Sequence, residues 1–384
     1  MLAAAAGAAV FLSGCSTPGK AGKETKHYIF YPAAPAVARY QYLTSFSEEK
    51  DLSAGHKSFA TFVTGEAPVS KRIIKPYGLA LHGETLYVCD TIAFAIDIIN
   101  LRTGKMRFFR PEGDGRLGKP INIAVDEEGA FYVADTAWGM VLMYGPDEQF
   151  RGAIGKRGVN KPSDVVVRGN RLYICDLLQR AIRVLDKRTH EELFRIPRKD
   201  DVPESILRSP VNIAVGEDGR VCVSDFGDFS VKLYDATGRF MLKVGELGDH
   251  IGGMVRPKGV ALDHANRFYV VDAATEVVQV FDEQGRLLIF FGEPAGSKVG
   301  LVLPAKVVLS YDEKVMDLFR KYLSPDFVAE YLIFVTSQYG PRKINVYAFG
   351  HRRSQAAAYA EQAAAEAKAL ETTRNDQPAE KKRK

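Results

Sequence analysis

The residues that most often carry metal, nucleophilic or redox chemistry are scarce in this 384-residue chain. It has four cysteines, one tryptophan and seven histidines. The histidines do not form a set of three or four with the spacing of zinc ligands. Neither a Gly-x-Ser-x-Gly elbow nor a glycine-rich phosphate loop is present. The sequence therefore lacks the usual signatures of zinc enzymes, serine hydrolases and nucleotide-binding proteins.

Long apolar runs are also scarce. The run over residues 2–12 has eleven residues, fewer than the roughly 20 that a transmembrane helix needs. It ends in Leu12-Ser13-Gly14-Cys15, which resembles the lipobox of bacterial lipoproteins. The resemblance implies a signal peptide over 1–14, a lipid on Cys15, a flexible tether over 15–39 and, because Ser16 follows the cysteine, an outer-membrane location. No Lys or Arg precedes the run, and a frayed N-terminus of a cytosolic protein is the alternative.

The chain also lacks a large excess of positive or negative charge. The chain has 52 Lys and Arg against 47 Asp and Glu, a net charge of +5, with 46% apolar residues. These values are typical of a soluble globular protein with a mixed surface, and they favour anionic partners only weakly. The C-terminal segment differs in composition. We expect an Ala-rich helix and then a disordered charged tail within 351–384.

What the sequence does contain is a repeat. Similar phrases such as "KPINIAVDEEGAFYVADT" and "SPVNIAVGEDGRVCVSD" return along the chain, each opened by a proline. The prolines are 44, 42, 48, 47 and 47 residues apart, the period of a propeller blade: Pro76, Pro120, Pro162, Pro210, Pro257 and Pro304. Each unit contains four short alternating runs separated by turn residues, which leaves no room for crossover helices. We therefore predict an all-β propeller of six blades.

The sixth unit is irregular. Apolar residues at 315, 318, 319, 322 and 323 follow its first strand at helical spacing, so we predict a helical insertion there. The unit also stops one strand short. The run "YQYLTSF" over 40–46 resembles the fourth strands of other units, and we expect it to complete the last blade and remove its free edge.

The repeated pattern Pro-x-x-[IV]-[AV]-[VL], followed by [FLV]-Y-[VI]-x-Asp, resembles the NHL-repeat β-propeller family over about 40–350. The resemblance implies the fold, but this family binds proteins, RNA and peptides, so it does not imply one function. Many members have Asn and Arg three and five positions after the Asp, and none of the five well-matched units here has that pair. Ligand contacts that depend on that Arg cannot be transferred.

Two recurring sets of polar residues are candidate sites. The first set closes the second strands, at turns where a carboxylate accepts backbone N–H groups, and we interpret it as structural: Asp90, Asp135, Asp176, Asp225 and Asp272. The second set lies two residues after each opening proline and should form a ring at the channel mouth: Gly78, Asn122, Asp164, Asn212, Gly259 and Lys306. Asn122, Asp164 and Asn212 offer oxygen ligands for a possible Ca²⁺, although Lys306 brings a positive charge to the same ring.

Aromatic residues form a second part of the expected binding face. The turns between second and third strands contain Phe94, Trp138, Phe226 and Phe229, and they open on the same side as the ring. The connectors 110–119, 155–161, 198–208 and 245–258 add eleven Lys and Arg against seven Asp and Glu. The alternative is that these aromatics pack under loops. Cys89, Cys175 and Cys222 lie on strands of different blades, too far apart for disulfides, and we expect buried free thiols.

These observations predict a lipid-anchored, monomeric propeller of the bacterial cell envelope that acts as a non-catalytic binding or scaffold protein. Its partner would be an envelope protein or an anionic ligand, with no nucleic acid and no cofactor. The alternative is a calcium-dependent envelope hydrolase, lactonase or lyase with its site at the channel mouth.

Overall fold

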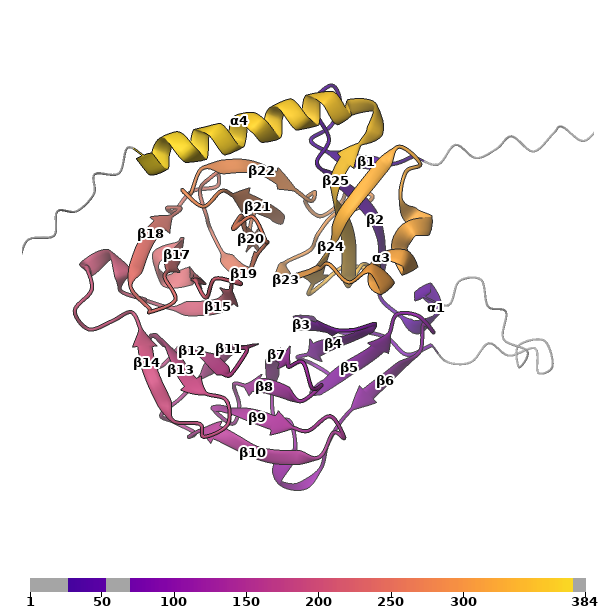
Figure 1. Cartoon of the computed structure of the whole chain (residues 1–384). Helices are drawn as coiled ribbons and strands as arrows, with labels where there is room; N and C mark the ends of the chain where they lie inside the picture. The colour runs from indigo at the N-terminus through magenta and orange to yellow at the C-terminus, as the bar shows by residue number, and fades with distance from the viewer. Residues whose placement is uncertain (1–26, 53–69, 376–384) are drawn as a thin grey trace, which may run out of the picture.

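The structure is a computed structural model that describes residues 27–52 and 70–375. Six antiparallel sheets surround a central channel as the blades of a propeller, which confirms the predicted fold (Figure 1). Within each of the first five blades the first strand in the chain is innermost, and its neighbours follow outward in sequence order. No helix among the described residues is long and apolar enough to cross a membrane.

The first five blades have four strands each. Blades 1 and 2 contain β3 (Pro76–His82), β4 (Thr85–Asp90), β5 (Ala95–Asn100), β6 (Met106–Phe109), β7 (Pro120–Val125), β8 (Phe131–Asp135), β9 (Met140–Tyr144) and β10 (Phe150–Gly155). Blades 3 and 4 contain β11 (Pro162–Arg168), β12 (Arg171–Asp176), β13 (Ala181–Asp186), β14 (Glu192–Ile196), β15 (Pro210–Val215), β16 (Val221–Asp225), β17 (Ser230–Tyr234) and β18 (Phe240–Val244). Blade 5 contains β19 (Pro257–Leu262), β20 (Phe268–Asp272), β21 (Val277–Phe281) and β22 (Leu287–Phe291).

The sixth blade joins the two ends of the chain. Its strands from the channel outward are β23 (Pro304–Ser310), β24 (Phe327–Ser337), β25 (Ile344–Arg352), β2 (Tyr40–Phe46) and β1 (Ile29–Tyr31). Strand β2 pairs antiparallel with β25, so the predicted closing strand is confirmed. Strand β1 lies inside the segment 15–39 that we expected to be a tether. The structure corrects this prediction from Ile29 onward, because Tyr31 packs against Phe291 and Tyr347 instead of remaining in solvent.

The helices lie outside the blades. Helix α3 (Glu313–Phe319) and the 3-10 turn η4 (Arg320–Tyr322) form the predicted insertion, with Val315 and Phe319 buried in the core between blades 6 and 1. Helix α4 (Ala356–Asn375) runs along the outside of blade 5 in Figure 1. The short elements are α1 (Glu49–Leu52), η1 (Gly113–Gly115), η2 (Pro203–Ser205), η3 (Phe226–Asp228) and η5 (Arg353–Gln355). The predicted signal peptide, Cys15 and the charged tail after 375 lie outside the described residues.

The apolar core of the described chain is divided into six clusters, one between each pair of neighbouring blades. The division follows from the burial pattern, because second strands such as β8 and β16 are buried at every position and pack on both faces. Outer strands such as β18 alternate buried and exposed side chains. Cys89, Cys175 and Cys222 are buried free thiols in this core, as predicted.

Candidate functional site at the central channel

The repeated aspartates are structural. Asp135 illustrates their role: its carboxylate accepts hydrogen bonds from Gly118 N and Lys119 N before the inner strand, and from Ala137 N and Trp138 N in the following turn. The same pattern recurs at Asp90, Asp176 and Asp272, where each carboxylate fastens the start of an inner strand to the turn beside it. Asp225 also accepts from the N–H groups before its inner strand, but its other partner is the ammonium of Lys232. None converges on a shared substrate position.

The ring of residues two positions after each proline exists, but it lies inside the channel and not at its open mouth. The register of every inner strand shifts just after its proline, which turns the following residues toward the axis. Asn122, Asp164 and Asn212 are fully buried and Lys306 is nearly so. We call these four residues the channel plug.

Internal hydrogen bonds hold the channel plug together. Lys306 Nζ lies 2.5 Å from Asp164 Oδ2 and 3.4 Å from Asn212 Oδ1. Asn122 Nδ2 donates to Ser163 O at 2.7 Å and to Asn212 Oδ1 at 3.2 Å. At the ring's remaining positions the inner strands leave no room for a side chain: a Cβ on Gly78 would lie 2.5 Å from Asn122 Cα.

The donor set of the plug does not fit a Ca²⁺ ion. Asp164 is the single carboxylate of the ring, and its Oδ2 already accepts from Lys306 Nζ and from Ile213 N, while its Oδ1 accepts from Val165 N. The ammonium therefore occupies the place beside the oxygens where a cation would bind. Within the described part of the chain, no group of three or more His, Cys, Asp or Glu side chains could hold a metal ion.

Next to the plug, the channel opens into a cavity of about 470 Å³, which we call the mouth cavity. Five of its lining side chains are basic: Lys75, Lys119, Lys161, Arg256 and Lys258. Four of the five immediately precede a blade-opening proline, so the blade repeat itself arranges them around the axis. No carboxylate lines the cavity, and in the described structure none of the five side chains forms an ion pair.

Lys258 differs from the other four because it is buried. Only 7% of its surface is exposed, and its Nζ lies 4.4 Å from the centre of the Tyr77 ring. No hydrogen bond from its ammonium group is found among the described residues. Burial, and then the positive charges of Arg256 and Lys75, lower the pKa of Lys258 to about 7. Burial raises the pKa of Tyr77 to about 12, so its phenol stays neutral and cannot balance the lysine charge.

The four predicted aromatics differ in exposure: two are exposed to solvent and two are half-buried. Phe94 and Phe226 are 53% and 41% exposed, and Phe226 lines the mouth cavity. Trp138 and Phe229 are half-buried, and Trp138 Nε1 donates to Arg116 O at 2.9 Å. Phe94 and Phe229 have φ values of 49° and 51°, in the left-handed region where the equivalent residue of blade 2 is Gly139. Retaining bulky residues there costs conformational energy.

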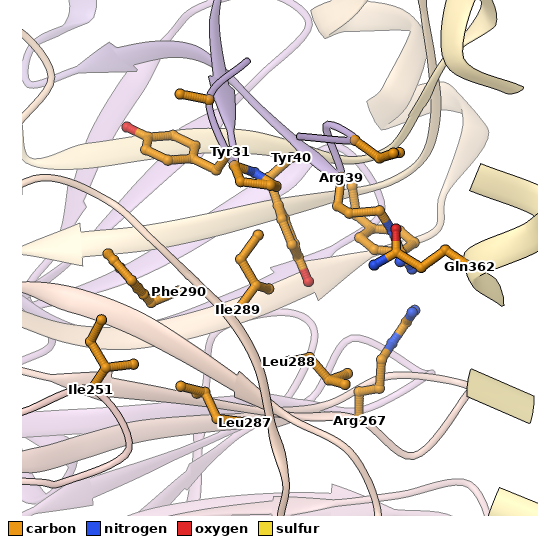
Figure 2. Close-up of a pocket in the computed structure, with 14 residues that line it drawn as sticks. Tyr31, Arg39, Tyr40, Ile251, Arg267, Leu287, Leu288, Ile289, Phe290 and Gln362 are labelled. Atoms are coloured by element: carbon orange, nitrogen blue, oxygen red, sulfur yellow. The ribbon is translucent and has the colours of Figure 1, made fainter. Parts of the chain in front are cut away.

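A second cavity, of about 430 Å³, lies between β22, the β1–β2 edge and α4. In Figure 2, Ile251, Leu287 and Phe290 line one side of it, and Arg39, Arg267 and Gln362 line the other. The guanidinium of Arg267 is engaged with Asp263 at 2.6 Å and lies over the Phe349 ring. This outer cavity is mainly apolar, and its lining shares no residue with that of the mouth cavity.

Comparison with known proteins supports the fold alone. No family model and no curated protein matches the chain. A protein of unknown function from Bacteroides thetaiotaomicron is 14% identical, with 72% of this chain and 70% of that chain covered and a TM-score of 0.52. Virginiamycin B lyase from Staphylococcus aureus is 12% identical, with 73% and 96% covered and a TM-score of 0.48. A chain of the nidogen/laminin complex is 18% identical, with 58% and 83% covered and a TM-score of 0.46.

The sequence points to the correct end of each inner strand. The residues two after each proline form the plug, whereas the mouth cavity beside it is lined by residues one before and one after several of the prolines, and by Phe226. One signal was present in the sequence: three opening prolines follow a lysine and a fourth follows an arginine. The burial of Lys258 had no such signal, because it arises from inner strands of several blades meeting at the axis.

Proposed function

We propose that this protein is a non-catalytic binding propeller that holds an anionic ligand, or an anionic group of an envelope protein, at its mouth cavity. The observation that carries the proposal is the cluster of five basic side chains around the mouth cavity, where the described residues supply neither an ion-pair partner nor a lining carboxylate. Basic groups placed this close repel one another, and a bound anion removes that repulsion. Tyr77 and Phe226 add aromatic surface for an organic portion of the ligand.

We further propose that the chain is an NHL-type lipoprotein of the outer membrane. The supporting observations are the phrase that opens each blade and the lipobox-like motif that ends in Cys15. The described chain enters the propeller through β1, at the outer edge of blade 6, and neither β1 nor β2 lines the mouth cavity.

A calcium-dependent hydrolase or lactonase is the less favoured function. Such an enzyme would have to move Lys306 Nζ away from Asp164 before a metal could bind. Metal analysis of the purified protein checks this point: about one bound Ca²⁺ per chain, lost in Asp164→Ala, would support the enzyme.

Inorganic pyrophosphate is a suitable probe for the proposed site, with binding measured by calorimetry at low salt. Lys119 and Lys161 are exposed, so the double variant Lys119→Gln/Lys161→Gln should fold normally and bind at least tenfold more weakly. Lys105→Gln/Lys314→Gln is the matched control, because it removes the same charge from exposed positions outside the cavity. Equal weakening by both pairs, or no binding to the parent protein, would contradict the proposal.

A further inference from the structure

Of the five basic residues of the mouth cavity, Lys258 is the one whose position suits a chemical role in addition to electrostatic attraction of an anion. The four residues that precede the prolines are at least partly exposed, and at most they hold an anion electrostatically. Lys258 follows its proline, and the bulge of β19 directs it into the cavity beneath them. The equivalent residues of the other blades are not basic: Tyr77, Ile121, Ser163, Val211 and Ala305.

Burial without a partner changes the chemistry of this amine. The other deeply buried lysines are neutralised, since Lys306 pairs with Asp164 and Lys232 pairs with Asp225 at 3.0 Å. Among the described residues, Lys258 has no ion-pair or hydrogen-bond partner, and its ammonium group lies against the Tyr77 ring. A lysine desolvated next to other cations is held partly as the neutral amine near neutral pH, and the neutral amine is the nucleophilic form.

We propose that Lys258 forms a reversible imine with a small anionic carbonyl compound of the 2-oxo dicarboxylate class, bound in the mouth cavity. This inference rests on the proposed function, because the surrounding cations are what would hold the carboxylates. A dianion suits four further basic groups, and a small acid fits a cavity of about 470 Å³. The ketone next to a carboxylate then lies near the buried amine.

The covalent step is balanced without an oxidant or a cofactor. The nitrogen lone pair of Lys258 adds to the carbonyl carbon and forms a C–N bond. The carbonyl oxygen leaves as water with the two hydrogens of the amine, and a C=N bond remains. Water reverses the step, so the protein captures and releases the ligand without converting it. The partly closed cavity limits access of water and favours the imine.

Reductive trapping tests the proposal. The protein is incubated at pH 7 with 2-oxoglutarate and sodium cyanoborohydride, and the adduct is located by peptide mass spectrometry. We expect a saturable single adduct on Lys258, reduced at least tenfold when excess 2-hydroxyglutarate is present. Lys258→Arg keeps the positive charge and should retain calorimetric binding of 2-hydroxyglutarate while losing the adduct. Lys119→Gln/Lys161→Gln should lower both.

The outcomes separate the two proposals. Binding of 2-hydroxyglutarate without a specific adduct on Lys258 would overturn the imine and leave the anion site intact. Labelling spread over exposed lysines, without preference for Lys258, would overturn it equally. Absence of binding of both acids and of pyrophosphate would overturn the anion site as well. Thermal unfolding of Lys258→Arg provides the check that the variant is folded.

Discussion

Asp97 is the residue whose side chain is least satisfied by its surroundings. It lies in β5 of blade 1 and is fully buried, and neither carboxylate oxygen has a hydrogen-bond partner in the described structure. The third strand of blade 4 carries Lys232 at the equivalent place, where it pairs with Asp225 and Asp228. Burial, and then the charge of Asp90, raise the pKa of Asp97 to about 8. The carboxyl group is therefore mostly protonated at neutral pH.

This raised pKa makes the stability of the fold depend on pH. Between about pH 4, the value for an unfolded aspartate, and about pH 8, the folded state binds a proton that the unfolded state has lost. Stability from this group is present below that window and is lost as the pH rises through it. We predict that Asp97→Asn leaves the free energy of unfolding nearly unchanged at pH 4 and raises it at pH 8 by a few kcal/mol.

The measurement is urea unfolding of the parent and the variant at several pH values. Asp114→Asn is the matched control, because Asp114 is exposed and its replacement should give parallel curves. If Asp97→Asn also runs parallel to the parent, Asp97 has a hydrogen-bond partner in solution and its pKa is not raised.

At the scale of elements, α3 is the part of blade 6 that departs most from the repeat. Its helical spacing was visible in the sequence, and the structure confirms a helix that packs on the propeller itself. Asp312 caps its first turn by accepting from Lys314 N. Phe319 is 4% exposed and meets the Phe334 ring edge-on at 5.6 Å, whereas Leu318 is only half-buried. The helix therefore belongs to the core between blades 6 and 1.

The difference between these two neighbours predicts a graded effect. Phe319→Asp places a charge in the core and should lower the free energy of unfolding by at least 3 kcal/mol, on the order expected for an unpaired buried polar group. Leu318→Asp should cost roughly half as much, because its carboxylate can reach water. Urea unfolding checks both, and pyrophosphate binding should persist wherever the fold does. Equal, small losses would mean that α3 detaches without consequence for the core.

Features that are encoded within a single repeat could be predicted well from the sequence. Contacts between side chains of different blades could not. Strand alternation, turn residues and the blade period are recorded within each repeat, and so the six blades and the closing strand β2 could be predicted. The salt bridge between Lys306 and Asp164 joins residues 142 apart, and it exists because inner strands of different blades meet at one axis. Spacing along the chain does not record which of these side chains pair. The strand β1 was missed because three residues carry too little alternation to be recognised.

At the scale of the whole molecule, the anchor and the propeller should be separable. The lipobox-like motif ends at Cys15, outside the described residues, and the first described strand, β1, begins at Ile29, so no described contact of the propeller involves the motif. We predict that Cys15→Ser moves the protein from the membrane fraction to the soluble envelope fraction. The melting temperature and the pyrophosphate affinity of the released protein should equal those of the parent without its first 15 residues. A Cys15→Ser protein that stays in the membrane in a processed, acylated form would show that the anchor lies elsewhere. Release accompanied by unfolding would show instead that the N-terminal segment supports the closed ring.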